Sequence, residues 1–155
     1  MGTAIAYYEM VDRLKETLES DVSINTVSYG NIYDAANNKT TMWPLAHFIV
    51  NNTELRDRTY GFNMTLSVLD LIDHSNENAV DKFRGNDNVM DIHNTMLAVI
   101  SRAMLMFKRK DARDSGYALV GDPVFEAFTH SFDKDTAGWY VDFTVEVVQR
   151  MEVGC

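Results

Sequence analysis

The sequence is short of cysteine and of long apolar runs, and both shortages exclude something. Among 155 residues the only cysteine is Cys155, so the chain can form neither an internal disulfide bond nor a cysteine-based metal cluster. No stretch approaches the ~18 consecutive apolar residues that suggest a membrane span. Residues 1–10 also lack the basic flank and apolar run of an export signal. The sequence therefore predicts neither export nor membrane insertion.

Positive charge is scarce as well. The chain has 14 Lys and Arg residues against 23 Asp and Glu residues, for a net charge of −9. An acidic surface repels the phosphates of nucleic acids, which disfavours a role in reading DNA sequence. The length and the hydrophobic content of 46% are those of one ordinary folded domain, and we expect it to span residues 1–155.

The motifs that usually identify an enzyme are missing. The sequence contains no Gly-x-Ser-x-Gly nucleophile elbow, no phosphate-binding P-loop, no Gly-x-Gly-x-x-Gly dinucleotide motif and no His-Glu-x-x-His metal motif. Ser101 and Ser115 have no evident base partner in the sequence. We therefore expect no catalytic residues, no cofactor and no enzymatic activity.

The four histidines were considered as metal ligands. His47 lies in an apolar strand pattern and is better explained as a hydrogen-bonded or half-exposed strand residue. His74 is surrounded by possible oxygen ligands, Asp70, Asp73 and Glu77, but the spacing matches no EF-hand loop. His93 is expected at the surface of a helix, and His130 is expected to bond Glu126 on a solvent face. The sequence predicts no metal site.

Two segments alternate apolar and polar residues with a period of two, the pattern of a strand with one buried face. The first is residues 60–72, with the apolar set Tyr60, Phe62, Met64, Leu66, Val68 and Ile72 interrupted only by Asp70. The second is near the end of the chain, where the apolar set is Trp139, Val141, Phe143, Val145 and Val147. These are the strongest local signals, and they predict a sheet.

Weaker patterns complete the fold. Helical periodicity predicts an N-terminal helix over 3–19, with Tyr7, Val11, Leu14 and Leu18 on its buried face, and a second helix over 89–108. Further strands are predicted over 22–29, 42–51, 117–120 and 124–132. The expected fold is α+β in the order α-β-β-β-α-β-β. Its mostly antiparallel sheet of about five strands carries two helices on one face.

Two long polar segments, 30–41 and 73–88, read as loops, with a shorter loop at 111–116. Loops of this length are often functional, and these two are either simple surface loops or contact arms that order on assembly. The basic residues at the end of the second helix either interact favourably with the helix dipole or form a salt bridge with a neighbouring subunit. The predicted contact residues are Asn31, Tyr33, Asp34, Asn38, Lys39, Phe83, Arg84, Lys108, Arg109 and Lys110.

Several segments together resemble the tail terminator, or tail-completion, proteins of long-tailed bacteriophages and allied neck proteins. The resemblance is carried by residues 27–33 (VSYGNIY), 43–52 (WPLAHFIVNN), 71–73 (LID), 85–88 (GNDN), 125–129 (FEAFT) and 137–145 (AGWYVDFTV). It covers nearly the whole chain, but no single motif is diagnostic.

This resemblance implies a structural virion protein without catalytic residues, assembled in the cytoplasm of the bacterial host and located in the tail or neck. Six copies would cap the tail tube as a ring and meet the head connector, with tube protein and connector as partners. Genomic DNA would pass the channel without sequence-specific binding, and an acidic lumen would let it pass without sticking. The alternatives are a head-closure or neck adaptor protein, or a small-molecule-binding α+β domain with a deep pocket.

Overall fold

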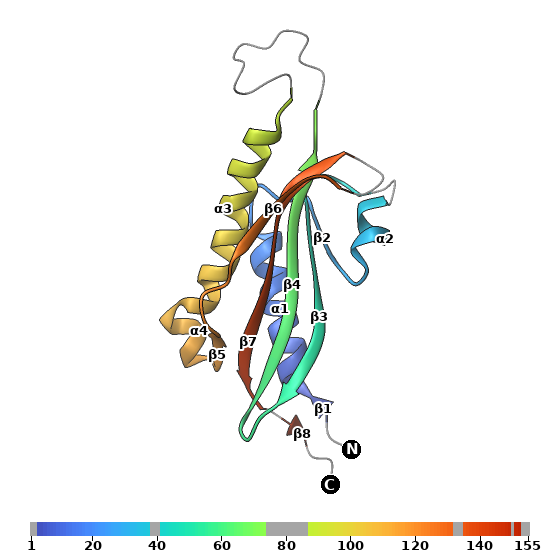
Figure 1. Ribbon diagram of the computed structural model, residues 1–155. Coiled ribbons are helices and arrows are strands. Elements are labelled where there is room, and N and C mark those ends of the chain that lie inside the picture. The colour runs from blue at the N-terminus through green and yellow to red at the C-terminus, as the bar shows by residue number, and fades with distance from the viewer. Residues whose placement is uncertain (1–2, 38–40, 74–86, 132–134, 150, 153–155) are drawn as a thin grey trace.

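A six-stranded, mostly antiparallel sheet forms the centre of the computed structural model (Figure 1). The structure describes residues 3–37, 41–73, 87–131, 135–149 and 151–152. The strand order is β2-β3-β4-β7-β5, and β6 pairs with β7 beside β5. The strands of this sheet are β2 (Thr26–Tyr29), β3 (Leu45–Leu55), β4 (Thr59–Leu71), β5 (Tyr117–Leu119), β6 (Phe125–Ser131) and β7 (Thr136–Val148). The predicted α+β class is confirmed.

The two best-patterned segments of the sequence are neighbours at the centre of the sheet. β4 and β7 pair antiparallel along their whole length, from Thr59 opposite Val148 to Leu71 opposite Thr136. β3 pairs antiparallel with the other side of β4. In β4 the alternation predicted from the sequence is confirmed, since one apolar set is buried against the helices: Phe62, Met64, Leu66 and Val68.

Two helices, α1 (Ile5–Glu19) and α3 (Val89–Lys108), pack on the same face of this sheet, as predicted (Figure 1). The buried stripe of α1 differs from the predicted one. Its fully buried residues are Ala6, Met10, Leu14 and Leu18. Tyr7 and Val11 only border the core, and Tyr8 is 66% exposed. The small Ala6 and the flexible Met10 let α1 approach the sheet more closely than the larger Tyr7 would.

The predicted first helix begins two residues too early. Thr3–Ala4 is the short strand β1, which pairs antiparallel with β8 (Met151–Glu152). This two-stranded pair joins the two ends of the described chain, which lie together at one end of the molecule in Figure 1. A pairing partner so distant in sequence leaves no local pattern from which it could be predicted.

The strand predicted over 22–29 is shorter than expected. Only β2 (Thr26–Tyr29) forms, and it runs parallel to β3. A turn precedes it, in which Asp21 Oδ1 accepts the backbone N–H of Ser23 at 3.1 Å. Asx turns of this kind compete with strand pairing. The strand predicted over 42–51 is shifted, since β3 begins at Leu45, directly after Pro44, and continues to Leu55. Proline has no N–H to donate to a ladder, which explains the later start.

Two segments predicted as loops contain short helices. The predicted loop 30–41 includes α2 (Ile32–Asn37), and the predicted loop 111–116 overlaps α4 (Lys110–Asp114). Asn31 Oδ1 accepts the backbone N–H of Tyr33 at 2.9 Å and so satisfies a free donor at the start of α2. These helices are too short for an apolar period to be visible in the sequence. Most of the second predicted loop, residues 74–86, lies outside the described residues.

Candidate functional site

The predicted contact residues do not form one site. Asn31, Tyr33 and Asp34 belong to α2 or its start, beside β2 and β3 at one edge of the sheet. Lys108 and Arg109 end α3, which lies over the other edge (Figure 1). Lys110 begins α4, but its side chain lies outside the described residues, as do Asn38, Lys39, Phe83 and Arg84. The structure therefore separates two groups of candidates by the width of the sheet.

Lys108 is engaged within the chain. Its Nζ lies 2.8 Å from Asp122 Oδ1 in the connection between β5 and β6, and this ion pair lowers the pKa of the Asp122 carboxyl. Both groups are exposed, so the pair contributes little stability. Arg109, the next residue, is also exposed and has no ion pair among the described residues. Of these two cations, Arg109 is the one available to a neighbouring molecule.

A larger polar surface was missed by sequence reasoning. On the side of the sheet opposite α1 and α3, the strand registers place polar side chains of β3, β4 and β7 from the middle of the sheet to the β3–β4 hairpin. We call this the open face, and it consists of Asn51, Asn52, Glu54, Arg56, Asn63, Thr65, Ser67, Tyr140, Asp142, Thr144 and Glu146. A period-two pattern implies such a face, but local alternation does not show which polar side chains of different strands meet on it.

Two chains of hydrogen bonds cross the three strands of the open face. In the first, Asn51 Nδ2 donates to Thr65 Oγ1 at 2.8 Å, and Thr65 Oγ1 donates to Asp142 Oδ1 at 2.5 Å. In the second, Asn63 Nδ2 donates to Asn52 Oδ1 at 2.5 Å and Asn63 Oδ1 accepts from the Thr144 hydroxyl. Each chain links β3, β4 and β7, so the polar surface is held as one rigid layer.

A β-bulge allows both asparagines of β3 to take part. The pairing of β3 with β4 shifts between Val50 and Asn52, which leaves Asn51 as the extra residue. A bulge of this kind lets two successive residues oppose one residue of the partner strand. The irregularity thus adds one polar side chain to the open face.

The open face is acidic. Glu54, Asp142 and Glu146 lie on it, and Arg56 is its one cation among the described residues. The Arg56 guanidinium lies 3.0 Å from Glu54 and 3.0 Å from Glu146, and it lowers the pKa of the Glu54 carboxyl. Farther from the hairpin, where Tyr140 lies opposite Ser67, Tyr140 donates its hydroxyl to Glu126 of the neighbouring β6. The surface therefore combines a net negative charge with side chains that are bonded to one another.

Of the two predicted alternatives for His47, the hydrogen-bonded strand residue is confirmed, and the side chain is buried rather than half exposed, with 3% of its surface accessible. Its Nε2 donates to the Gly30 carbonyl at 2.7 Å, and its Nδ1 accepts from the Ser28 hydroxyl at 2.6 Å. Burial lowers the pKa of the imidazole. Because both ring nitrogens have partners in the neutral form, His47 is a structural residue that ties β3 to the end of β2.

His93 also differs from the sequence expectation. It is half buried on α3, and its Nε2 donates to the Phe128 carbonyl of β6 at 3.1 Å. Its own backbone carbonyl accepts the Trp139 indole N–H at 2.8 Å. His93 therefore joins α3 to β6 and β7. The side chain of His130 lies outside the described residues.

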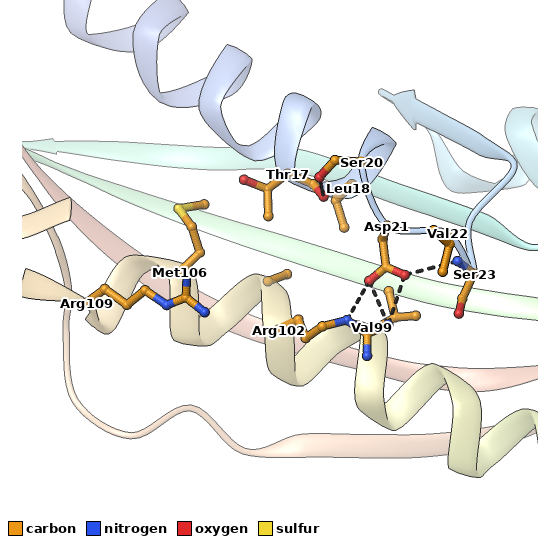
Figure 2. A pocket seen from close by; sticks show the side chains of 11 residues that line it. Thr17, Leu18, Ser20, Asp21, Val22, Ser23, Val99, Arg102, Met106 and Arg109 are labelled. Carbon is orange, nitrogen blue, oxygen red and sulfur yellow. Dashed lines mark hydrogen bonds and ion pairs between the residues drawn. The ribbon is translucent and has the colours of Figure 1, made fainter. Parts of the chain in front are cut away.

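A groove lies between the end of α1 and the middle of α3 (Figure 2). It has a volume of about 590 Å³. Asp21 and Arg102 face each other across it, with Arg102 Nε 2.8 Å from Asp21 Oδ2 and Nη2 2.9 Å from Oδ1. This bidentate pair satisfies both groups, so the groove offers no convergent set of free acid, base or nucleophile. It carries no chemistry that we can assign.

Within the described segments, no group of three or more His, Cys, Asp or Glu side chains is arranged to hold a metal ion. The cation site considered around His74 and Glu77 falls outside those segments. No helix in the described parts of the chain is both long and apolar enough to cross a membrane.

The chain matches no protein-family model, and no curated protein sequence is significantly similar to it.

Proposed function

We propose that this protein is a structural subunit of a long-tailed bacteriophage, a tail terminator that caps the tail tube as a six-fold ring and meets the head connector. A head-closure or other neck adaptor is the alternative within the same class. The two differ in which neighbour the ring binds, the tube protein or a connector on the portal side. The proposal begins from the sequence resemblance, and the open face is the observation that supports it best.

The open face has the properties expected of a channel lining. It is rigid, because the hydrogen-bond chains through Thr65 and Asn63 join its three strands. It is also acidic, with Glu54, Asp142 and Glu146 against Arg56. Carboxylates repel the phosphates of a passing duplex, so DNA slides without being held. We therefore propose that the open face lines the lumen and that the helices lie outside it.

The groove between α1 and α3 supports a binding or catalytic role less well. Of its three charged residues, Asp21 and Arg102 neutralise each other, and Arg109 adds a single cation without an acid, base or nucleophile beside it among the described residues (Figure 2). A small-molecule site is expected to keep a few polar groups free for its ligand. In a scaffold, by contrast, such a pair simply joins two helices.

Tube capping tests the proposal directly. Tail-tube protein from the same genome is polymerised with increasing amounts of the purified protein, and tube length is measured by electron microscopy. A terminator is expected to shorten the tubes in proportion to its concentration and to appear as a ring at one end. Tubes of unchanged length with free ends would exclude the terminator role. Binding to the portal-side connector instead would select the adaptor.

Removing negative charge from the open face tests whether this face lines the lumen of the ring. The open-face variant Glu54→Gln, Asp142→Asn, Glu146→Gln is compared with Asp12→Asn, Glu16→Gln, Glu19→Gln, which removes the same charge from the exposed side of α1. Assembled rings of the open-face variant are expected to retain duplex DNA at low salt, and rings of the α1 variant are not. Equal retention by both would contradict the proposed orientation.

A further inference from the structure

Exposed apolar side chains gather near both outer edges of the main sheet. One edge is β2, next to α2, and the other is formed by β5 and β6, next to α3. Figure 1 places α2 and α3 on opposite sides of the molecule. Scattered apolar residues are normal at a surface, but two groups at opposite edges are arranged as a repeating contact requires.

The first group, which we call the α3 surface, consists of Leu97, Leu105, Val124 and Arg109. Arg109 follows Leu105 by one helical turn, at the border with the groove between α1 and α3 that it also lines (Figure 2). Leu105 is 53% exposed and Val124 is 73% exposed. Leu105 also borders a shallow groove of about 210 Å³ between α3 and the β5–β6 connection, where Pro123 and Phe125 form the far wall. Leu97 lies two turns before Leu105, so the apolar strip runs along the helix.

The second group, the α2 surface, consists of Tyr29, Tyr33, Met42 and Asp34. Tyr33 is 61% exposed and Met42 is 65% exposed. Met42 lies close to β2, because its backbone N–H donates to Thr26 Oγ1 at 3.1 Å. Tyrosine and methionine are both common in protein interfaces, where they bury a large area and adapt in shape.

The charges of the two surfaces are complementary. The neighbouring cations on α3 are already paired, Lys108 with Asp122 and Arg102 with Asp21. Arg109 has no ion pair in the described part of the chain, and neither has the exposed Asp34 of the α2 surface. Each surface thus offers one exposed charge, of opposite sign, beside an apolar strip.

We propose that the α3 surface of one copy binds the α2 surface of the next copy, with Arg109 of the first facing Asp34 of the second. The contact joins two different surfaces, so it repeats head to tail and closes into a ring when the rotation allows. This inference rests on the proposed ring function and names the subunit interface within it. A two-fold dimer would instead require one surface that is complementary to itself.

Mixing two defective variants tests the head-to-tail contact. Leu105→Asp disrupts the α3 surface and leaves the α2 surface intact, and Tyr33→Asp does the reverse. Each variant alone is expected to be monomeric by sedimentation velocity and native mass spectrometry. An equimolar mixture is expected to form a one-to-one dimer through the one remaining pair of intact surfaces. Leu55→Asp is the control, since Leu55 is an exposed apolar residue at the hairpin end of β3.

A charge swap tests the predicted pair itself. Arg109→Asp and Asp34→Arg are each expected to raise the Kd of self-association about tenfold or more, because each places like charges together. The double variant is expected to associate within about threefold of the native protein. Circular dichroism of every variant shows whether the fold is retained.

The outcomes separate this inference from the proposed function. If the native protein and both surface variants form the same ring, the interface is wrong and the ring remains. If the native protein stays monomeric up to about 1 mM, where even a millimolar Kd populates the complex, the head-to-tail contact is overturned, and the terminator role is decided separately by tube capping. A two-fold dimer that survives in either surface variant would also overturn the head-to-tail contact. Monomeric variants whose mixture dimerises would support it.

Discussion

The two faces of the central sheet are built from the same strands and differ in almost every other respect. On the helix side, β4 contributes Leu66 and Val68 to an apolar core beneath α1 and α3. On the open face the same strand contributes Asn63 and Thr65 to hydrogen-bond chains in contact with water. Apolar burial stabilises the fold, and exposed polar bonds add little net stability. We infer that the helix side determines stability and that the open face is available for function.

The largest expected difference comes from neighbouring residues on opposite faces of β4. Leu66→Ala, which empties a fully buried position, is expected to lower the free energy of unfolding by about 4 kcal/mol. Thr65→Ala, its matched control, removes hydrogen bonds on the open face and is expected to cost about 1 kcal/mol. Urea denaturation of both variants measures the contrast. Equal losses would mean that the open face is part of the stabilising core.

A second contrast uses two glycines of the sheet. A Cβ added to Gly138 would lie 1.9 Å from the backbone oxygen of Val68, so Gly138→Ala must force β7 away from β4. We expect a loss of about 3 kcal/mol. A Cβ at Gly61 would meet only the side chain of Arg56, which can move, so Gly61→Ala is the control. Equal shifts of the melting temperature in the two variants would show that β7 can move away from β4 at little cost.

A third prediction concerns pH. The folded pKa of His47 lies below its ordinary value of 6.5, so the unfolded chain binds more protons on acidification. Stability is fully present above pH ~6.5 and is lost as pH falls towards the folded pKa, with a slope of at most about 1.4 kcal/mol per pH unit.

The measurement is the free energy of unfolding from pH 8 to pH 5, in the native protein and in His47→Gln. The variant is expected to be less stable at pH 8, because it loses bonds to Gly30 and Ser28, and to depend less on pH. If the free energy of unfolding depends on pH equally in the native protein and in the variant, His47 does not change its protonation on unfolding.

The smallest expected effect is at the hairpin end of the open face. Arg56→Gln removes the ion pairs to Glu54 and Glu146, which are exposed to solvent. Exposed pairs of this kind contribute little, and salt screens them. We expect no resolvable change in unfolding at 0.5 M salt. A clear destabilisation at that ionic strength would show that the open face stabilises the fold after all.

The elements that could be predicted from the sequence are those with long periodic patterns. Residues 60–72, 89–108 and 138–147 were placed correctly because each repeats its period several times. The helix α2 was missed because six residues are too few for a period, and its start depends on one bond from Asn31. The pairing of β1 with β8 was missed because it joins residues almost 150 positions apart in the chain.

The predicted contact residues also separate into features that are local in the sequence and features that only the fold decides. Tyr33, Asp34, Lys108 and Arg109 were selected by residue type and by their place at helix or loop ends, which are local features. Whether a charge is already paired depends on a distant partner, as Lys108 with Asp122 illustrates. Only the fold distinguishes Lys108, which is occupied, from Arg109, which has no such partner among the described residues.

By itself, the sequence determined the class of the fold and the strands at its centre, because alternation and helical periodicity are properties of neighbouring residues. It also determined that one side of β4 and β7 is apolar and that the other is polar up to Ser67, where Leu69 and Leu71 follow in β4. The tertiary structure decided which of these sides the helices cover, since that depends on how α1 and α3 pack. It decided as well that α2 and the end of α3 lie at opposite edges, because strand order is set by contacts between residues distant in the chain.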